Sequence, residues 1–163
     1  MLFDKTVAVV VPAYNEEKQI GHVLKTMPHF VDRIIVVNDC STDNTANVVL
    51  SYIQEERAIG KVIRQVSSAI DGDEYDRADK LLKEKREQDI QLYPRSEIAN
   101  VYPDTDRIIL INHKKNSGVG AAIARGYKWC LDHNIDCTAV MAGDGQMDPT
   151  ELEKICTPVL TED

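Results

Sequence analysis

Apolar residues gather in four short runs along this chain, and more polar stretches separate the runs. They occupy residues 7–11, 33–37, 107–112 and 138–142 and are rich in Val and Ile. Their apolar character is continuous rather than alternating, which is typical of strands covered on both faces, as in a parallel sheet. We therefore predict four parallel strands at these positions.

Helical spacing fills most of the stretches between the runs. Residues 16–27, 43–56 and 118–133 place apolar side chains three or four positions apart. Candidate N-cap residues precede the three stretches: Asn15, then Ser41 or Thr42, then Asn116 or Ser117. Alternating strands and helices predict right-handed βαβ units, hence an α/β fold with a Rossmann-like, open, mainly parallel sheet and helices on both faces.

One segment, at about residues 60–106, breaks this alternation. It is polar and charge-rich, and we expect a solvated helix at residues 75–91, where Leu81 and Leu82 form a narrow apolar stripe. A chain of 163 residues has room for one domain, so we interpret the segment as a polar helical insertion in a single domain spanning 1–163. The insertion either flanks the site or offers a partner surface, and a purely solvated excursion fits equally well.

The net charge of the chain limits the kinds of molecule that it can be expected to bind. The formal net charge of −8 argues against a nucleic-acid binder, which requires a basic face. To bind an anionic substrate, the chain would need a local source of positive charge, such as a metal ion, a helix N-terminus or an isolated arginine. The apolar runs are too short to cross a bilayer and the start, MLFDKT, lacks a signal-peptide pattern, so we expect a cytoplasmic location.

Polar clusters follow each of the four runs, and ligands of open parallel sheets bind at that end of the strands. After the second run, helix capping explains Ser41 and Thr42 but not Asp39, which can accept a hydrogen bond from a ribose hydroxyl or a base N–H. After the third run, Gly118 and Gly120 open a helix and let a phosphate or base approach the backbone. Arg125, farther along, offers a cationic contact.

The loop after the fourth run is DGQMDP, residues 144–149. Asp148, followed by Pro149 and then by Glu151, predicts a capping box that opens a helix. Asp144 and Gln146 have no such structural explanation. Two oxygen ligands at this spacing suit Mg²⁺ or Mn²⁺, which would neutralise a diphosphate.

Four motifs taken together (PAYNEE, NDCSTDNT, NSGVGAA and DGQMDP) resemble the nucleotide-sugar half of family-2 glycosyltransferases. The branch most similar is that of the dolichyl- or polyprenyl-phosphate mannose and glucose synthases. The resemblance implies a GT-A type fold, a UDP- or GDP-linked sugar donor, a divalent ion, and inverting transfer to a lipid phosphate or glycan acceptor. It also implies a place at the inner face of the cell membrane.

The same resemblance assigns roles to individual residues. Those expected to contact the donor are Pro12, Ala13, Tyr14, Glu16, Val37, Asp39, Gly118, Gly120, Arg125, Ala142 and Gly143. Asp144 and Gln146 are expected to hold the metal ion. Ala142 departs from the pattern, since members of this branch often carry an Asp there.

A second departure concerns length. The sequence stops soon after the metal-binding loop, so we expect a truncated donor half, without the acceptor-binding half and without an identified general base. Two other functions stay open: a nucleotidyltransferase, although PAYNEE offers acids where that class needs a glycine-rich basic loop, and a non-catalytic nucleotide-sugar-binding scaffold. A homo-oligomer is open as well.

Overall fold

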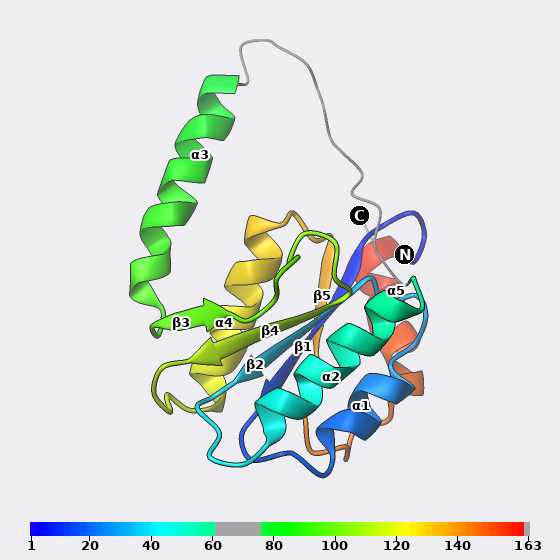
Figure 1. Cartoon of the computed structure of the whole chain (residues 1–163). Helices are drawn as coiled ribbons and strands as arrows, with labels where there is room; N and C mark the ends of the chain where they lie inside the picture. Colours follow the sequence, from blue (N-terminus) through cyan, green and yellow to red (C-terminus); the bar gives the residue numbers. More distant parts are fainter. Residues whose placement is uncertain (61–75, 162–163) are drawn as a thin grey trace.

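A five-stranded sheet forms the centre of the molecule in this computed structural model, which describes residues 1–60 and 76–161 (Figure 1). The strand order is β3-β4-β2-β1-β5. The strands are β1 (Val7–Ala13), β2 (Arg33–Asn38), β3 (Ser96–Ile98), β4 (Ile108–His113) and β5 (Cys137–Val140). All neighbouring pairs are parallel except β3 with β4. The predicted open, mainly parallel α/β sheet is confirmed.

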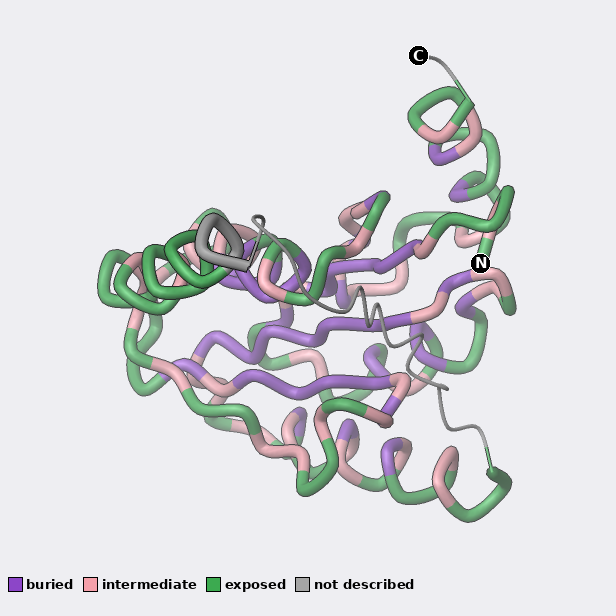
Figure 2. Tube along the Cα trace, turned by 90° about the horizontal axis from the view of Figure 1, so that it is seen from above, coloured by how far each residue is buried: buried purple, intermediate pink, exposed green. Residues whose placement is uncertain are grey.

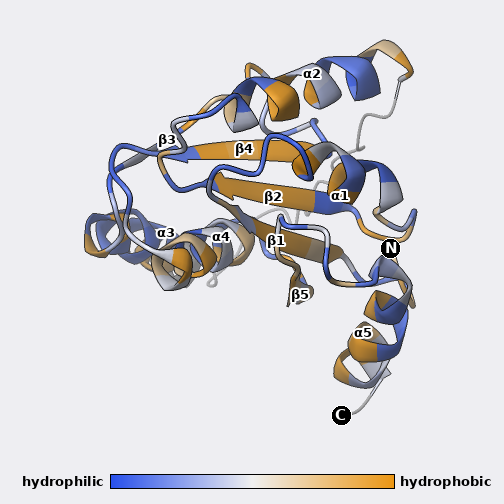
Figure 3. Cartoon of the chain, turned by 90° about the horizontal axis from the view of Figure 1, so that it is seen from below, coloured by the Kyte–Doolittle hydropathy of each residue, from blue (hydrophilic) through white to orange (hydrophobic). Residues whose placement is uncertain are grey.

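Helices cover both faces of this sheet. Helices α1 (Ile20–Thr26) and α2 (Thr45–Ala58) lie on one face, and α4 (Val119–Asp132) lies on the other, with α3 (Asp76–Asp89) beside it (Figure 3). Helix α5 (Leu152–Thr161) packs against β5. Short 3-10 helices span Ile90–Leu92 and Pro149–Glu151.

The core consists of two layers, one on each side of the sheet. Val9 and Val11 of β1 belong to the layer under α1 and α2, while the intervening Val10 belongs to the layer under α4. The central strands are buried along most of their length, as the purple tube in Figure 2 shows. Burying each such side chain contributes about 1.5–3 kcal/mol, so continuous Val and Ile runs favour a strand covered on both faces.

The helix starts predicted from capping residues are wrong. Helix α1 begins at Ile20, four residues later than expected, and α2 and α4 begin at Thr45 and Val119. None of the three has a side-chain cap from the candidates Asn15, Ser41, Thr42, Asn116 or Ser117. Asn15 and Ser41 instead bond to each other's loops: Asn15 Oδ1 accepts the backbone N–H of Thr42, and Ser41 Oγ accepts that of Asn15, both at 2.9 Å.

The insertion is partly integrated into the sheet. Helix α3 confirms the expected helix, and β3 adds an antiparallel edge strand that the sequence pattern did not reveal. Beyond β3, the Asn100 side chain donates to Ile108 O and accepts from Leu110 N, both at 2.8 Å. Residues 61–75 of the insertion, including Tyr75 of the expected helix, lie outside the described residues.

Within the described ranges, 1–60 and 76–161, no helix is both long and apolar enough to cross a membrane.

Candidate functional site

The topological switch point of the sheet lies at β1, and it places the loops that carry the four motifs around one opening. β2 and β4 extend the sheet on one side of β1, whereas β5 pairs with its other side, with Val10 opposite Val140. Crevices form at such switch points because the loops leaving the two strands diverge. The loops after β1, β2, β4 and β5 meet there.

A cavity of about 330 Å³ lies at this end of the sheet. Its lining is Pro12, Ala13, Tyr14, Glu16, Asp39, Val119, Ala122, Ala142, Gly143 and Asp144. Eight of these ten were expected from the sequence. Val119 and Ala122 were missed because they read as ordinary apolar positions of a helix, and only the packing of α4 beside β1 brings them to the cavity.

Asp39 is the most constrained residue of the cavity. It is 3% exposed, and its Oδ1 accepts from Ser117 N at 2.9 Å and faces His113 Nδ1 at 2.7 Å, while its Oδ2 accepts from Gly118 N at 2.7 Å. The carboxylate therefore joins the end of β2 to the end of β4 and the start of α4. His113 was missed by sequence reasoning; its position at the end of a buried run was the available signal.

The loop after β1 is held by the turn after β2. Glu16 N donates to Thr45 Oγ1 at 2.9 Å, and Glu17 N donates to Asp43 Oδ2 at 3.1 Å. Asn15 N donates to Ser41 Oγ at 2.9 Å. The hydroxyl-rich turn thus fixes the backbone of PAYNEE beside the cavity.

Gly143 brings the loop after β5 close to β1. Its N–H donates to Pro12 O at 3.2 Å, and a Cβ there would lie 3.1 Å from Pro12 O and 3.3 Å from Ala13 Cβ. A side chain at residue 143 would push this loop outward, so glycine lets Asp144 reach the cavity.

Two carboxylates share the mouth of the cavity. Partial burial, then the negative charges of Asp144 and Asp43, raise the pKa of Glu16. Mutual repulsion of this kind is relieved when a cation lies between the carboxylates. Among the described residues that line this cavity, none carries a positive charge.

The metal-ligand prediction is only partly reflected in the geometry. Asp144 lines the cavity, and its Oδ1 accepts from Gln146 N at 3.0 Å, but the side chain of Gln146 is exposed and does not line the cavity. Among the residues that the structure describes, no group of three or more His, Cys, Asp or Glu is arranged to hold a metal ion. Mg²⁺ tolerates such a sparse site because water and phosphate oxygens complete its shell.

Asp148 is structural, as predicted. Its Oδ1 accepts from Thr150 N at 2.9 Å, and Pro149 occupies the first helical position. The reciprocal half of the predicted capping box is wrong, because Glu151 pairs with Lys154 at 2.8 Å instead.

Four residues expected at the donor do not line this cavity. Val37 is fully buried in β2, Gly118 contributes its N–H to Asp39, and Gly120 is exposed in the first turn of α4. Arg125 lies elsewhere because its Nε donates to Ser96 Oγ at 2.9 Å, which holds the guanidinium toward the β3 edge.

Comparison with known proteins agrees with this geometry. A model of glycosyl transferase family 2 matches residues 8–68, and 28% identity over 160 residues relates the chain to a UDP-N-acetylglucosamine–dolichyl-phosphate N-acetylglucosaminyltransferase of Methanococcus voltae. Over residues 8–68 the chain is therefore similar to glycosyltransferase family 2. The match to the M. voltae protein covers 98% of this chain and 49% of that protein. The mostly parallel five-stranded sheet with helices is consistent with a GT-A type fold.

Two further proteins match the chain over different lengths. An uncharacterised protein of Methanocaldococcus jannaschii is 28% identical over 155 residues, 94% of this chain and 42% of its own length. A 4,4'-diaponeurosporenoate glycosyltransferase of Staphylococcus aureus is 49% identical over 51 residues, 29% of this chain and 13% of its own length. The chain thus spans about half the length of the curated relatives that it matches most extensively.

Proposed function

We propose that this chain is the donor-binding part of a glycosyltransferase that binds a UDP-linked sugar with Mg²⁺ or Mn²⁺. The observation that carries the proposal is the single cavity that gathers residues of the four motifs at the switch point of the sheet. The UDP donor is suggested by the name of the M. voltae relative.

Donor recognition would begin with Asp39 and Tyr14. Asp39 Oδ2 accepts one hydrogen bond from within the described chain, so a second lone pair can accept from a base N–H or a ribose hydroxyl. Tyr14 is 47% exposed at the rim of the cavity and offers an aromatic face to the base.

The diphosphate would lie beside Asp144. Two carboxylates at this mouth repel a diphosphate unless a cation intervenes, and the charge of Asp144 adds to partial burial in raising the pKa of Glu16. Asp144 would hold the metal ion, with Gln146 next to it, and the ion would neutralise the diphosphate as a leaving group.

Transfer would follow the inverting course implied by the family resemblance. The acceptor oxygen attacks the anomeric carbon as the nucleoside diphosphate leaves from the opposite side. Glu16, Asp39 and Asp144 serve the donor in this proposal, so no described residue is assigned as the base.

The proposed acceptor is a polyprenyl phosphate, because the M. voltae relative is named for dolichyl phosphate. A lipid acceptor would bring the chain to the cytoplasmic face of the membrane as a peripheral protein.

Thermal unfolding with UDP, in the presence and absence of Mn²⁺, tests the donor site. At a ligand concentration 100-fold above Kd, binding adds about 2.7 kcal/mol, or roughly 5–10 °C for a chain of this size. We expect this shift only with Mn²⁺ or Mg²⁺. Asp144→Asn should abolish the metal-dependent part, whereas Asp148→Asn, four residues away, should retain it because Asn caps a helix as well as Asp does.

Other outcomes would redirect the assignment. Absence of any shift with UDP and GDP would exclude a nucleoside-diphosphate site, and a shift with GDP alone would change the base. Stabilisation by a nucleoside triphosphate plus a sugar phosphate would favour nucleotidyltransfer. Binding of a UDP-sugar without transfer in any longer form of the protein would favour the scaffold.

A further inference from the structure

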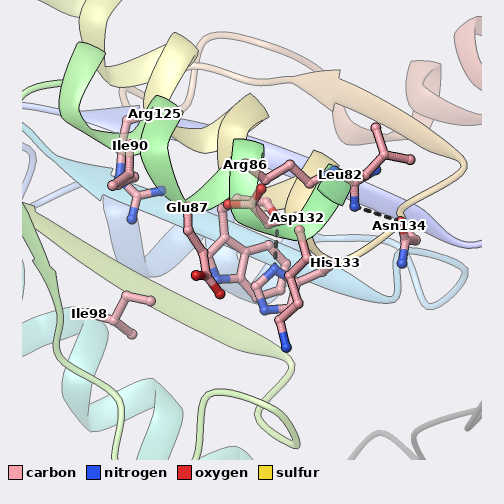
Figure 4. Close-up of a pocket in the computed structure, with 11 residues that line it drawn as sticks. Leu82, Arg86, Glu87, Ile90, Ile98, Arg125, Asp132, His133 and Asn134 are labelled. Atoms are coloured by element: carbon pink, nitrogen blue, oxygen red, sulfur yellow. Dashed lines mark hydrogen bonds between the residues drawn. The ribbon is translucent and has the colours of Figure 1, made fainter. Parts of the chain in front are cut away.

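A second, larger cavity of about 740 Å³ lies between α3, β3 and α4 (Figure 4). Helix α4 borders both cavities: Ala122 lines the cavity at the strand ends, and Arg125 lines the second. The two cavities share no lining residue. The second cavity is therefore distinct from the donor site, and it has no role in the proposed function.

Arg125 places an incompletely compensated cation in this cavity. The residue is 7% exposed, and the hydrogen bond from its Nε to Ser96 Oγ is the one that its guanidinium makes within the described residues. Burial lowers the pKa of Arg125, an effect only partly offset by the charge of Asp132. Because a buried cation is costly without a counter-charge, an anion bound here would be stabilised by this guanidinium.

Trp129 forms part of the cavity wall. Its indole Nε1 is buried and has no hydrogen-bond partner among the described residues. The ring is fixed by stacking on His133, with the ring centroids 3.7 Å apart. Burial lowers the pKa of His133, so the imidazole stacked on Trp129 is neutral at neutral pH.

The acidic side chains near the cavity leave the Arg125 guanidinium available to bind an anion. Asp132 Oδ1 accepts from Lys128 Nζ at 2.5 Å, and Glu87 is exposed to water on α3. Lys83 and Arg86 also line the cavity from α3. The balance of charge around the cavity is therefore favourable to an anion, although the whole chain is acidic.

Helix α3 and its neighbours also contribute apolar side chains to the cavity wall. Leu82, Ile90 and Ile98 line it, and all three are large apolar side chains left exposed to solvent. Figure 4 shows Ile98 on the strand side of the cavity. An aliphatic group laid along these side chains would remove them from water.

We propose that this cavity binds an amphiphilic anion. A phosphate or carboxylate head would accept from the Arg125 guanidinium, and an aliphatic chain would cover Leu82, Ile90 and Ile98, with the Trp129 ring in the same cavity wall. The volume lies within the usual range of small-ligand sites, roughly 300–1,000 Å³.

Trp129 makes the test direct because it is the sole tryptophan of the chain. We expect decyl phosphate or decanoate, below micelle formation, to change its fluorescence saturably, and the stronger of the two identifies the head group. Inorganic phosphate and decanol at the same concentrations should give no saturable change. An equal response to decanol, an equal response to inorganic phosphate, or no response to either amphiphile would overturn the proposal.

Adjacent positions of α3 provide a matched pair of variants. Leu82 lines the cavity and Leu81 does not, yet both are exposed, at 52% and 58%, so neither substitution disturbs the core. Leu82→Glu should weaken binding of the amphiphile at least tenfold, and Leu81→Glu should leave it unchanged. Equal effects of the two would contradict the proposed position of the aliphatic chain.

Arg125→Gln tests the head group, with circular dichroism as the check on folding. We expect at least a tenfold loss of affinity, and unchanged affinity in a folded variant would contradict the role of the guanidinium. Stabilisation by UDP and Mn²⁺ should be intact in Leu82→Glu, so failure of one site is distinguishable from failure of the other.

Discussion

Asp39 illustrates how much a single buried carboxylate can organise. Its two oxygens accept two backbone N–H groups and contact one imidazole, and these partners come from β4 and from the start of α4. The same residue lines the donor cavity. Its proposed binding role and its structural role are therefore inseparable.

Replacing Asp39 with Asn should affect both roles. An amide offers one oxygen where the carboxylate offers two, so at least one N–H at the start of α4 loses its charged acceptor. We expect a loss of about 1.5–3 kcal/mol in the free energy of unfolding, measured with urea, together with loss of the UDP-dependent shift. Asp4→Asn, at an exposed residue, should change neither quantity.

Asp136 gives a pH-dependent prediction. The backbone N–H and the hydroxyl of Thr6 both donate to Asp136 Oδ2 at 2.7 Å and lower the pKa of this carboxyl. A lowered folded-state pKa contributes stability that is present above the unfolded value, about 3.9, and lost as pH falls through the folded value.

The free energy of unfolding should therefore be greater in the unmodified chain than in Asp136→Asn at pH 5–7, by about 1 kcal/mol or less for so exposed a group. The difference should shrink below pH 4. Urea unfolding at several pH values measures it, and a difference that grows on acidification would contradict the assignment.

At the scale of elements, the contact between α4 and β1 depends on a glycine. A Cβ at Gly126 would lie 2.3 Å from Val10 Cγ1 and 2.8 Å from Val10 Cγ2, so any side chain there would push α4 off the sheet. Gly120, in the first turn of the same helix, has no such neighbour within 4 Å.

The two glycines should respond differently to alanine. Gly126→Ala should destabilise the chain by about 1–3 kcal/mol through overpacking, whereas Gly120→Ala should be neutral or stabilising by up to about 1 kcal/mol. In the double variant Gly126→Ala with Val10→Ala, the cost should be smaller than the sum of the two single costs. Strictly additive costs would show that Val10 is not the obstacle.

At the scale of the whole molecule, stability should be distributed unevenly. The central strands are buried on both faces, whereas α3 leaves Leu81 and Leu82 exposed and stands outside the two core layers (Figure 1). Helices with few buried contacts open at low free energy.

Amide hydrogen exchange should reveal this difference. Helices α3 and α4 both have 14 residues, yet amides of α3 should exchange much faster than those of α4. Decyl phosphate should slow exchange in α3 if the second cavity binds it. Equal protection of the two helices without ligand would show that α3 is stabilised by contacts other than those described.

The pattern of residues along the chain determined the sheet and most of the donor cavity. Runs such as residues 7–11 and 33–37 can be satisfied only by strands covered on both faces, and polar loops after such strands meet at one end of a parallel sheet. Residues expected there on motif evidence, among them Tyr14, Asp39 and Asp144, do line one cavity.

Tertiary structure decided what local pattern could not express. Strand β3 has too few residues to show an alternating pattern in the sequence. The helices start later than predicted because Asn15 and Asp39 form hydrogen bonds with residues far along the sequence. The position of Arg125 depended on Ser96, which is 29 residues away. The periodicity of apolar residues indicates which side chains are buried. The hydrogen-bond partner of a polar group depends instead on which segments lie close together in the folded chain.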